Sequence, residues 1–187
     1  MIRKIWLLTL AKRIRLITEY VGADEIIRSG ADLLSRETVD DCSTLLAHVF
    51  EEERARLGTE PVIDLFASLH QRQGDLPYFV ARPRDSQGPK CRGFDALSHP
   101  WVGHCYAFPP LHLVGVAVEK ARSELQRDCN SVMLVVPYWT GARWWPLIYP
   151  FGPKPIGLSQ NILKDPSPSE SELWSKNIEL AAVLLQK

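Results

Sequence analysis

Three carboxylates and one pair of prolines have the residue types and positions from which chemistry could be built. Asp32 lies in GADLLSR at 30–36, near the start of a short predicted helix, where an aspartate usually acts as a cap. Asp64, in VIDLFAS, and Asp95, in GFDALS, are candidates for ligand contacts, although Asp64 equally fits a cap on a strand end or turn. The Pro109–Pro110 pair ends a predicted strand and stiffens the turn there, because proline fixes φ.

The other reactive residue types show no catalytic spacing. The five histidines have no metal-ligand spacing, and the four cysteines lack the CxxC spacing of zinc sites. We expect free, buried thiols in an intracellular protein. Ser68 has no Gly-x-Ser-x-Gly context, which argues against a serine hydrolase. With 22 basic and 22 acidic residues, the chain has no global positive field for nucleic acids.

The elements that would position these residues alternate along the chain. Apolar runs predict strands at 62–68, 104–110 and 131–139. Continuous apolar strands that alternate with helices indicate a parallel sheet covered on both faces, so we predict an α/β fold for 61–150. The Pro- and Gly-rich segment 82–93 predicts a loop. The spacing of apolar residues predicts helices at 2–12, 43–57, 111–126 and 169–186, and branched residues predict a further strand at 15–21.

Changes in composition divide the chain into four parts. They are an N-terminal segment (1–40), a linker helix (41–60), the α/β domain (61–150) and a Pro- and Ser-rich tail with a terminal helix (151–187). No stretch approaches the ~20 apolar residues that cross a bilayer, so we expect no membrane partner. Four tryptophans could stack on nucleobases, although aromatics flanked by apolar runs more often belong to the core. These are Trp101, Trp139, Trp144 and Trp145.

The N-terminal segment resembles the end of the ribonuclease H domains that are fused to reverse transcriptases. A helix, a strand and a polar turn precede the Ala-Asp-x-Leu-Ser-Arg motif at 31–36. The resemblance implies that Asp32 is the last of four carboxylates that hold two Mg²⁺ ions, which clamp the attacking and leaving oxygens of a phosphodiester. The other three carboxylates would lie upstream. One carboxylate cannot hold two metals, so we do not expect hydrolysis by this chain alone.

Several blocks from 13 to 148 resemble, in the same order, the C-terminal region of polyproteins of DIRS-like (tyrosine-recombinase) retrotransposons. The blocks are DLFAS, GFDALSHPW, HCYAFPP and VVPYW. The resemblance implies a polyprotein fragment in the nucleus or cytoplasm, with DNA or RNA and the rest of the polyprotein as partners.

That region in turn resembles the phage-type adenine-specific DNA methyltransferases. Their Rossmann-like sheet binds S-adenosylmethionine at the carboxyl ends of its strands. An Asn/Asp-Pro-Pro-Tyr/Phe turn accepts hydrogens from the target amine and stacks on the flipped base. Here Pro109 and Pro110 match, whereas Phe108 replaces the polar acceptor and Leu111 replaces the aromatic residue. By resemblance, Asp64 would lie near the methionine or ribose part of the cofactor.

We therefore predict a degenerate methyltransferase-like module that is catalytically inactive alone and needs no cofactor in the isolated chain. Mg²⁺ and S-adenosylmethionine are implied by resemblance only. Three alternatives remain: an active S-adenosylmethionine-dependent DNA adenine methyltransferase, a non-enzymatic module that binds nucleic acid or protein, and a decayed gene fragment.

Overall fold

The computed structural model describes residues 42–68, 71–81, 88–164 and 178–187, which belong to one compact unit spanning 39–187. The predicted helix at 2–12, the strand at 15–21 and the segment around Asp32 lie outside the described residues.

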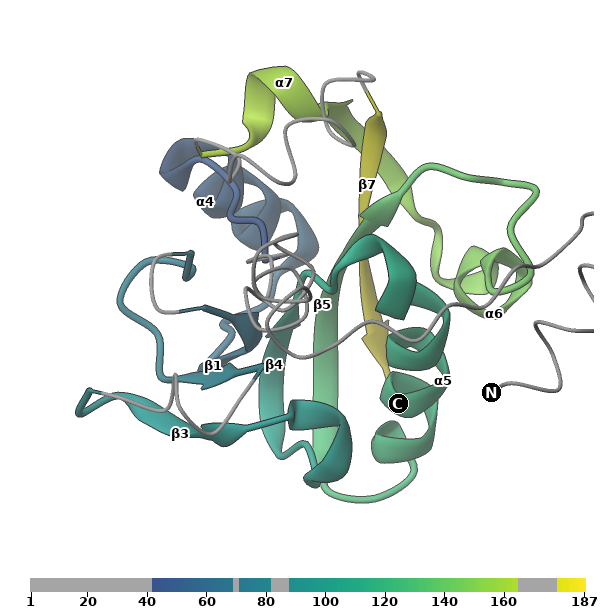
Figure 1. Ribbon diagram of the computed structural model, residues 1–187. Coiled ribbons are helices and arrows are strands. Elements are labelled where there is room, and N and C mark those ends of the chain that lie inside the picture. The colour runs from purple at the N-terminus through teal and green to yellow at the C-terminus, as the bar shows by residue number, and fades with distance from the viewer. Residues whose placement is uncertain (1–41, 69–70, 82–87, 165–177) are drawn as a thin grey trace, which may run out of the picture. The chain divides into compact units, whose positions relative to one another are not determined.

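Seven strands of the described part form one mixed sheet in the order β3-β2-β1-β4-β5-β7-β6. The first five in this order are mutually parallel, and β7 is antiparallel to both of its neighbours. The protein is thus α/β with a mostly parallel sheet (Figure 1). The strands are β1 Ile63–Ala67, β2 Tyr78–Val80, β3 Cys91–Phe94, β4 Gly103–Ala107, β5 Cys129–Pro137, β6 Lys154–Leu158 and β7 Glu179–Gln186.

Helices cover both faces of the central strands. Figure 1 shows α4 and α5 on opposite sides of β4 and β5. The described parts of the connections from β1 to β2 and from β2 to β3 contain no helix. The α-helices are α4 Ala47–Leu57, α5 Val114–Leu125, α6 Trp145–Ile148 and α7 Ser159–Ile162, and the 3₁₀ turns are η2 Ala96–Ser98, η3 Leu111–Leu113 and η4 Tyr149–Phe151.

Strand β5 is buried on both faces, which explains its unbroken apolar run. Val132, Leu134 and Val136 pack on the α5 side, while Met133 and Val135 pack on the α4 side. This division follows the two-residue period of a strand. Strand β7 pairs with β5 from Ser131↔Gln186 to Pro137↔Leu180 and is buried along most of its length.

The two longer helices dock through apolar stripes at helical spacing. Val114, Ala117, Val118 and Ala121 form the buried stripe of α5, as the spacing of apolar residues predicts. On the other face, α4 places Phe50 edge-on against Tyr106 of β4, with ring centroids 5.1 Å apart. Helix α4 ends at Gly58, whose φ of 63° is accessible to glycine at little cost.

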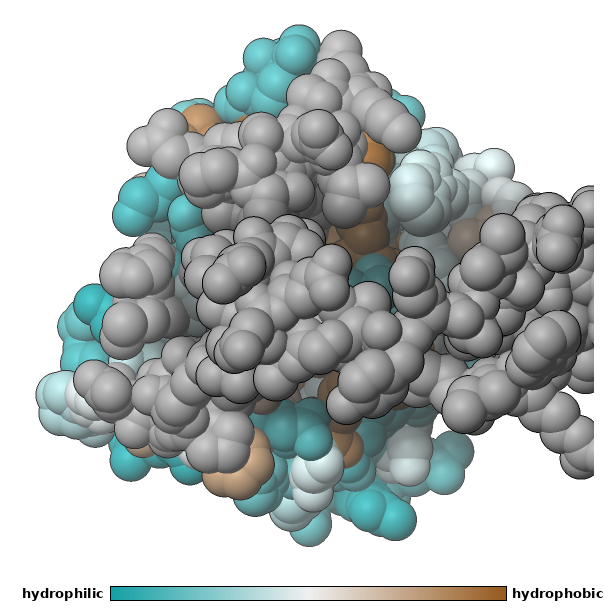
Figure 2. Space-filling model, viewed as in Figure 1, coloured by the Kyte–Doolittle hydropathy of each residue, from teal (hydrophilic) through white to brown (hydrophobic). Residues whose placement is uncertain are grey.

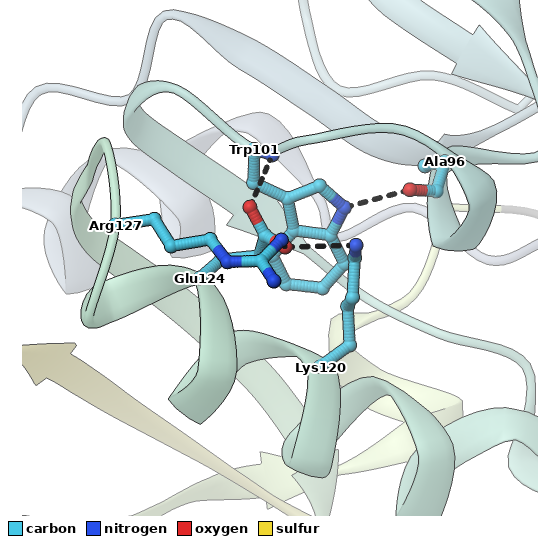
Figure 3. A network of polar contacts seen from close by, with 5 residues as sticks. All are labelled: Ala96, Trp101, Lys120, Glu124 and Arg127. Atoms are coloured by element: carbon cyan, nitrogen blue, oxygen red, sulfur yellow. Dashed lines mark hydrogen bonds and ion pairs between the residues drawn. The ribbon is translucent and has the colours of Figure 1, made fainter.

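A buried polar network anchors the end of α5 (Figure 3). Glu124 is 1% exposed and accepts hydrogen bonds from the backbone N–H of Trp101 at 3.0 Å and from Lys120 Nζ at 2.8 Å. Arg127 lies 3.5 Å from the same carboxylate. The indole N–H of Trp101 donates to the carbonyl of Ala96 at 2.8 Å. The network therefore joins α5 to the segment that connects β3 with β4.

The structure confirms the strands predicted at 62–68, 104–110 and 131–139, with the second ending at Ala107, before the prolines. It confirms helices within 43–57 and 111–126. All four cysteines are free, and three are buried as predicted, whereas Cys91 is half-buried. Two local predictions are wrong. Strand β3 begins inside the predicted loop 82–93, and the C-terminal end of the predicted helix 169–186 is strand β7.

The predicted tail at 151–187 contributes β6 and β7 to the same sheet as β1. Hydrophilic residues make up most of the visible surface of the described part (Figure 2). Among the described helices, none combines the length and the apolar character needed to cross a membrane.

Candidate functional site

The strand order creates a switch point between β1 and β4. From β1 the chain continues to β2 and β3 on one side, and β4 leads to β5 on the other. Open α/β sheets bind ligands outside the carboxyl ends of their strands at such a point, because the loops there diverge and leave a crevice. The carboxyl ends of β1 and β4 are Ala67 and Ala107, so the loops after these residues define the candidate site.

A cavity of about 100 Å³ lies at this edge of the sheet. Phe66 and Ala67 of β1, Val80 of β2, and Asp95 beyond β3 line it, together with Pro110 beyond β4. The lining is apolar except for Asp95, which suits a flat apolar group with a hydrogen-bond donor at its edge. Ligand pockets usually enclose about 300 Å³ or more, so only part of a nucleoside-sized molecule fits the present shape.

Asp95 has an unusual backbone conformation. Among the described residues it is the one non-glycine with positive φ, at 50°. Aspartate tolerates this region better than most residues, and such conformations concentrate at functional sites. Its amide donates to the carbonyl of Val80 at 2.8 Å, and its carboxylate accepts a hydrogen bond from the Ser98 hydroxyl. The prediction that Asp95 could contact a ligand is compatible with this position.

Asp64 does not line this cavity. It is 3% exposed, and its two carboxylate oxygens accept the backbone N–H groups of Phe66 at 3.1 Å and Gln73 at 2.9 Å. Burial raises the pKa of Asp64 to about 6, because the loss of hydration outweighs the two hydrogen bonds that favour the charged form. The carboxylate thus holds the β1–β2 connection, which is the capping role that the sequence left open.

The Phe108–Pro109–Pro110–Leu111 turn directly follows β4. Phe108 is 1% exposed and packs in the α4-side core with Tyr106, so its side chain is turned away from the crevice. Pro110 lines the cavity, and its carbonyl accepts the N–H of Leu113 at 2.8 Å. None of the four side chains has a polar atom. The turn consequently offers only backbone polar groups to a ligand.

The predicted metal ligand Asp32 lies outside the described residues. Within the described ranges, no three His, Cys, Asp or Glu side chains gather closely enough to hold a metal ion. Of the tryptophans considered for base stacking, Trp101 and Trp145 are buried in the core, whereas Trp139 is 45% exposed.

Sequence reasoning missed Gln73, which is 3% exposed. Its side-chain oxygen accepts the N–H of Leu45 at 3.2 Å, so it links the β1–β2 connection to the segment that enters α4. No local pattern marks such a glutamine, since its partner is 28 residues away.

No family model matches this chain, and no curated protein matches it either.

Proposed function

We propose that residues 42–187 are a methyltransferase-like, Rossmann-type module of a retroelement polyprotein. The module retains part of a nucleoside-binding crevice and lacks the groups that would activate an amine for methyl transfer. The ribonuclease H remnant and the Mg²⁺ role of Asp32 belong to the same proposal and rest on the sequence resemblance.

The strand order is the observation that carries this proposal. The order 3-2-1-4-5 is that of the dinucleotide-binding folds, which place their ligand at the switch point. Beyond β5 the sheet continues with β7, which is antiparallel to both of its neighbours, and ends with β6. The paired prolines follow β4 beside the switch point, which agrees with the position of the family's motif.

The geometry of the Phe108–Leu111 turn supports the proposal that the module does not transfer methyl groups. Activating an adenine amine requires a polar acceptor aimed at the crevice, and removing one positioned polar group of this kind typically costs ~10²–10³ in rate. Phe108 supplies no acceptor and faces the core. Replacing Phe108 by asparagine alone should therefore not restore transfer, and burying the amide there should destabilise the fold by about 3–5 kcal/mol, as for other large core truncations.

Calorimetric titration of the full chain with S-adenosylmethionine tests the retained crevice. Because the cavity must widen, we expect a Kd of ~100 µM to 1 mM. Asp95→Asn, which keeps the side-chain shape and tolerates positive φ, should weaken binding at least ~5-fold, or ~1 kcal/mol. Asp128→Asn is the matched control, because Asp128 is exposed and precedes β5 at the opposite edge of the sheet. Absence of binding at millimolar ligand would contradict a retained crevice.

A transfer assay on adenine-containing DNA separates this proposal from the active methyltransferase. We expect no methyl transfer by the wild-type chain. Transfer that disappears in Asp95→Asn would contradict the proposal and favour an active enzyme.

A further inference from the structure

A second hollow, of about 660 Å³, lies at the entry to α4. Thr44–Ala47 form one wall, Arg72–Gly74 of the β1–β2 connection form another, and Lys164 beyond α7 completes the lining. None of these residues lines the cavity at Asp95, so the hollow is a separate feature.

The charged residues that line this hollow have one sign. Arg72 and Lys164 are cationic, and no acidic residue lines the hollow. Within the described part, neither side chain forms an ion pair. Arg72 lies 5.5 Å above the ring of Tyr78, a contact that holds its guanidinium in place. Arg72 also attracts Asp75 at longer range, but Asp75 is paired with Lys90. Since no carboxylate of the described part contacts Arg72 or Lys164 directly, the two cations favour an anionic ligand.

The start of α4 adds backbone donors. The helix has no side-chain cap and no acidic residue in its first turn. The N–H of Leu46 donates to the carbonyl of Ile162 at 2.8 Å, whereas the next two amides, of Ala47 and His48, have no acceptor in the described part. The first amides of a helix favour anions, because their unpaired N–H groups and the helix dipole act together.

Thr44 gives a second, independent indication of a ligand. It lines the hollow, it is 3% exposed, and its hydroxyl has no hydrogen-bond partner among the described residues. A buried hydroxyl without a partner is unfavourable, and a rotation of this side chain toward the hollow would let a ligand oxygen satisfy it. The backbone around it is fixed, since its carbonyl accepts the N–H of Lys164 at 2.8 Å.

The walls are also tied to each other. Gln73 accepts the N–H of Leu45 at 3.2 Å, and Asp64 accepts the N–H of Gln73 at 2.9 Å. An isolated antiparallel β-bridge between Leu45 and Leu163 connects the first wall to the segment that carries Lys164. The donors therefore keep their relative positions before any ligand arrives, which reduces the entropy lost on binding.

We propose that this hollow binds a phosphate-class oxyanion through Arg72, Lys164, the Thr44 hydroxyl and the free amides at the start of α4. Free phosphate, a nucleotide or the backbone of a nucleic acid could supply the same group. The proposal stands independently of cofactor binding at Asp95.

Titration of the full chain with inorganic phosphate, at constant ionic strength set with chloride, is the direct test. We expect a Kd of ~1 mM or tighter. Arg72→Gln and Lys164→Gln should each weaken binding at least ~5-fold, whereas Arg122→Gln, an exposed cation on α5, should leave it unchanged. Thr44→Val should weaken phosphate binding while leaving the urea midpoint equal or higher, because it removes an unpartnered buried hydroxyl.

The source of the phosphate is resolved by competition. If a fluorescent single-stranded oligonucleotide binds and inorganic phosphate displaces it, the nucleic-acid backbone is the source, and Arg72→Gln should weaken it too. If phosphate binds without displacing the oligonucleotide, a free phosphate or nucleotide is the source. No saturable phosphate binding, or equal losses in Arg122→Gln and Arg72→Gln, would overturn the proposal.

Discussion

Replacing Glu124 by glutamine tests whether one buried carboxylate holds the end of α5 in place. Glu124 lies in the last turn of this helix, where the helix dipole disfavours negative charge. Its retention there depends on three donors: the backbone N–H of Trp101 at 3.0 Å, Lys120 Nζ at 2.8 Å and Arg127 at 3.5 Å. Glutamine keeps the shape and removes the charge.

The size of the effect follows from counting acceptors. The Trp101 amide binds one oxygen of Glu124 and Lys120 binds the other, so glutamine, which has an NH₂ in place of one oxygen, can retain only one of the two bonds. A buried donor left without an acceptor costs about 1–3 kcal/mol, and the lost bond to a charged group is of similar size. Because these two quantities overlap, we expect a total loss of ~2–3 kcal/mol. With an m-value of about 2 kcal/mol/M, the urea midpoint falls by ~1–1.5 M.

Equilibrium unfolding in urea measures this loss, and Glu119→Gln is the matched control. Glu119 lies on the same helix and is exposed, so its substitution should change stability by less than ~0.5 kcal/mol. Although burial opposes the charged form of Glu124, hydrogen bonds from Lys120 and Trp101 lower its pKa. The stabilisation by Glu124 is therefore complete above pH 4.5, the ordinary pKa of a glutamate. It is lost as the pH falls through the lower pKa that Glu124 has in the folded protein. Equal midpoints for the two variants at neutral pH would refute the reasoning.

Two further predictions concern Asp64 and Gly157. The folded pKa of Asp64 is raised from 3.8 to about 6, so the folded protein binds the extra proton, and stability falls as the pH rises through that window, by up to ~3 kcal/mol. Asp64→Asn should lack this slope in urea midpoints measured at pH 4 to 7, and an unchanged slope would contradict the assignment. Gly157 has φ 136°, and a Cβ there would lie 3.0 Å from Ile162 Cγ2. Gly157→Ala should lower stability by about 1–3 kcal/mol. Gly141→Ala is the control and should not lower it, because a Cβ at Gly141 would meet nothing within 4 Å. Similar melting temperatures for the two variants would contradict the predicted strain at Gly157.

Sequence patterns predicted the central parallel strands and their main helix correctly. Both elements leave a local signal in the sequence. A strand that is buried on both faces, such as β5, has an unbroken apolar run, and a helix that is buried along one stripe has apolar residues at helical spacing, as at Val114, Ala117, Val118 and Ala121. In a parallel sheet the residues after β1 and β4 lie at one edge, but β3, which brings Asp95 to the same edge, was not predicted. Asp95 and Pro110 line one cavity there.

Strand β7 shows where local patterns fail. ELAAVLLQ at 179–186 contains alanine and leucine, which favour helices, and its even apolar character fits either a buried helix or a buried strand. Pairing with β5 over seven residue positions decides the outcome, since each extended residue gains a partner that is far away in the sequence.

The candidate sites divide in the same way. Residue identity alone establishes that no side chain of the Phe108–Leu111 turn carries a polar acceptor, because it fixes which side-chain atoms exist. Three other features became visible in the folded protein: Phe108 faces the core, the Asp64 carboxylate accepts two backbone N–H groups, and Thr44, Arg72 and Lys164 line one hollow. Side-chain direction and the meeting of distant segments depend on long-range packing, which leaves no periodic trace in the chain.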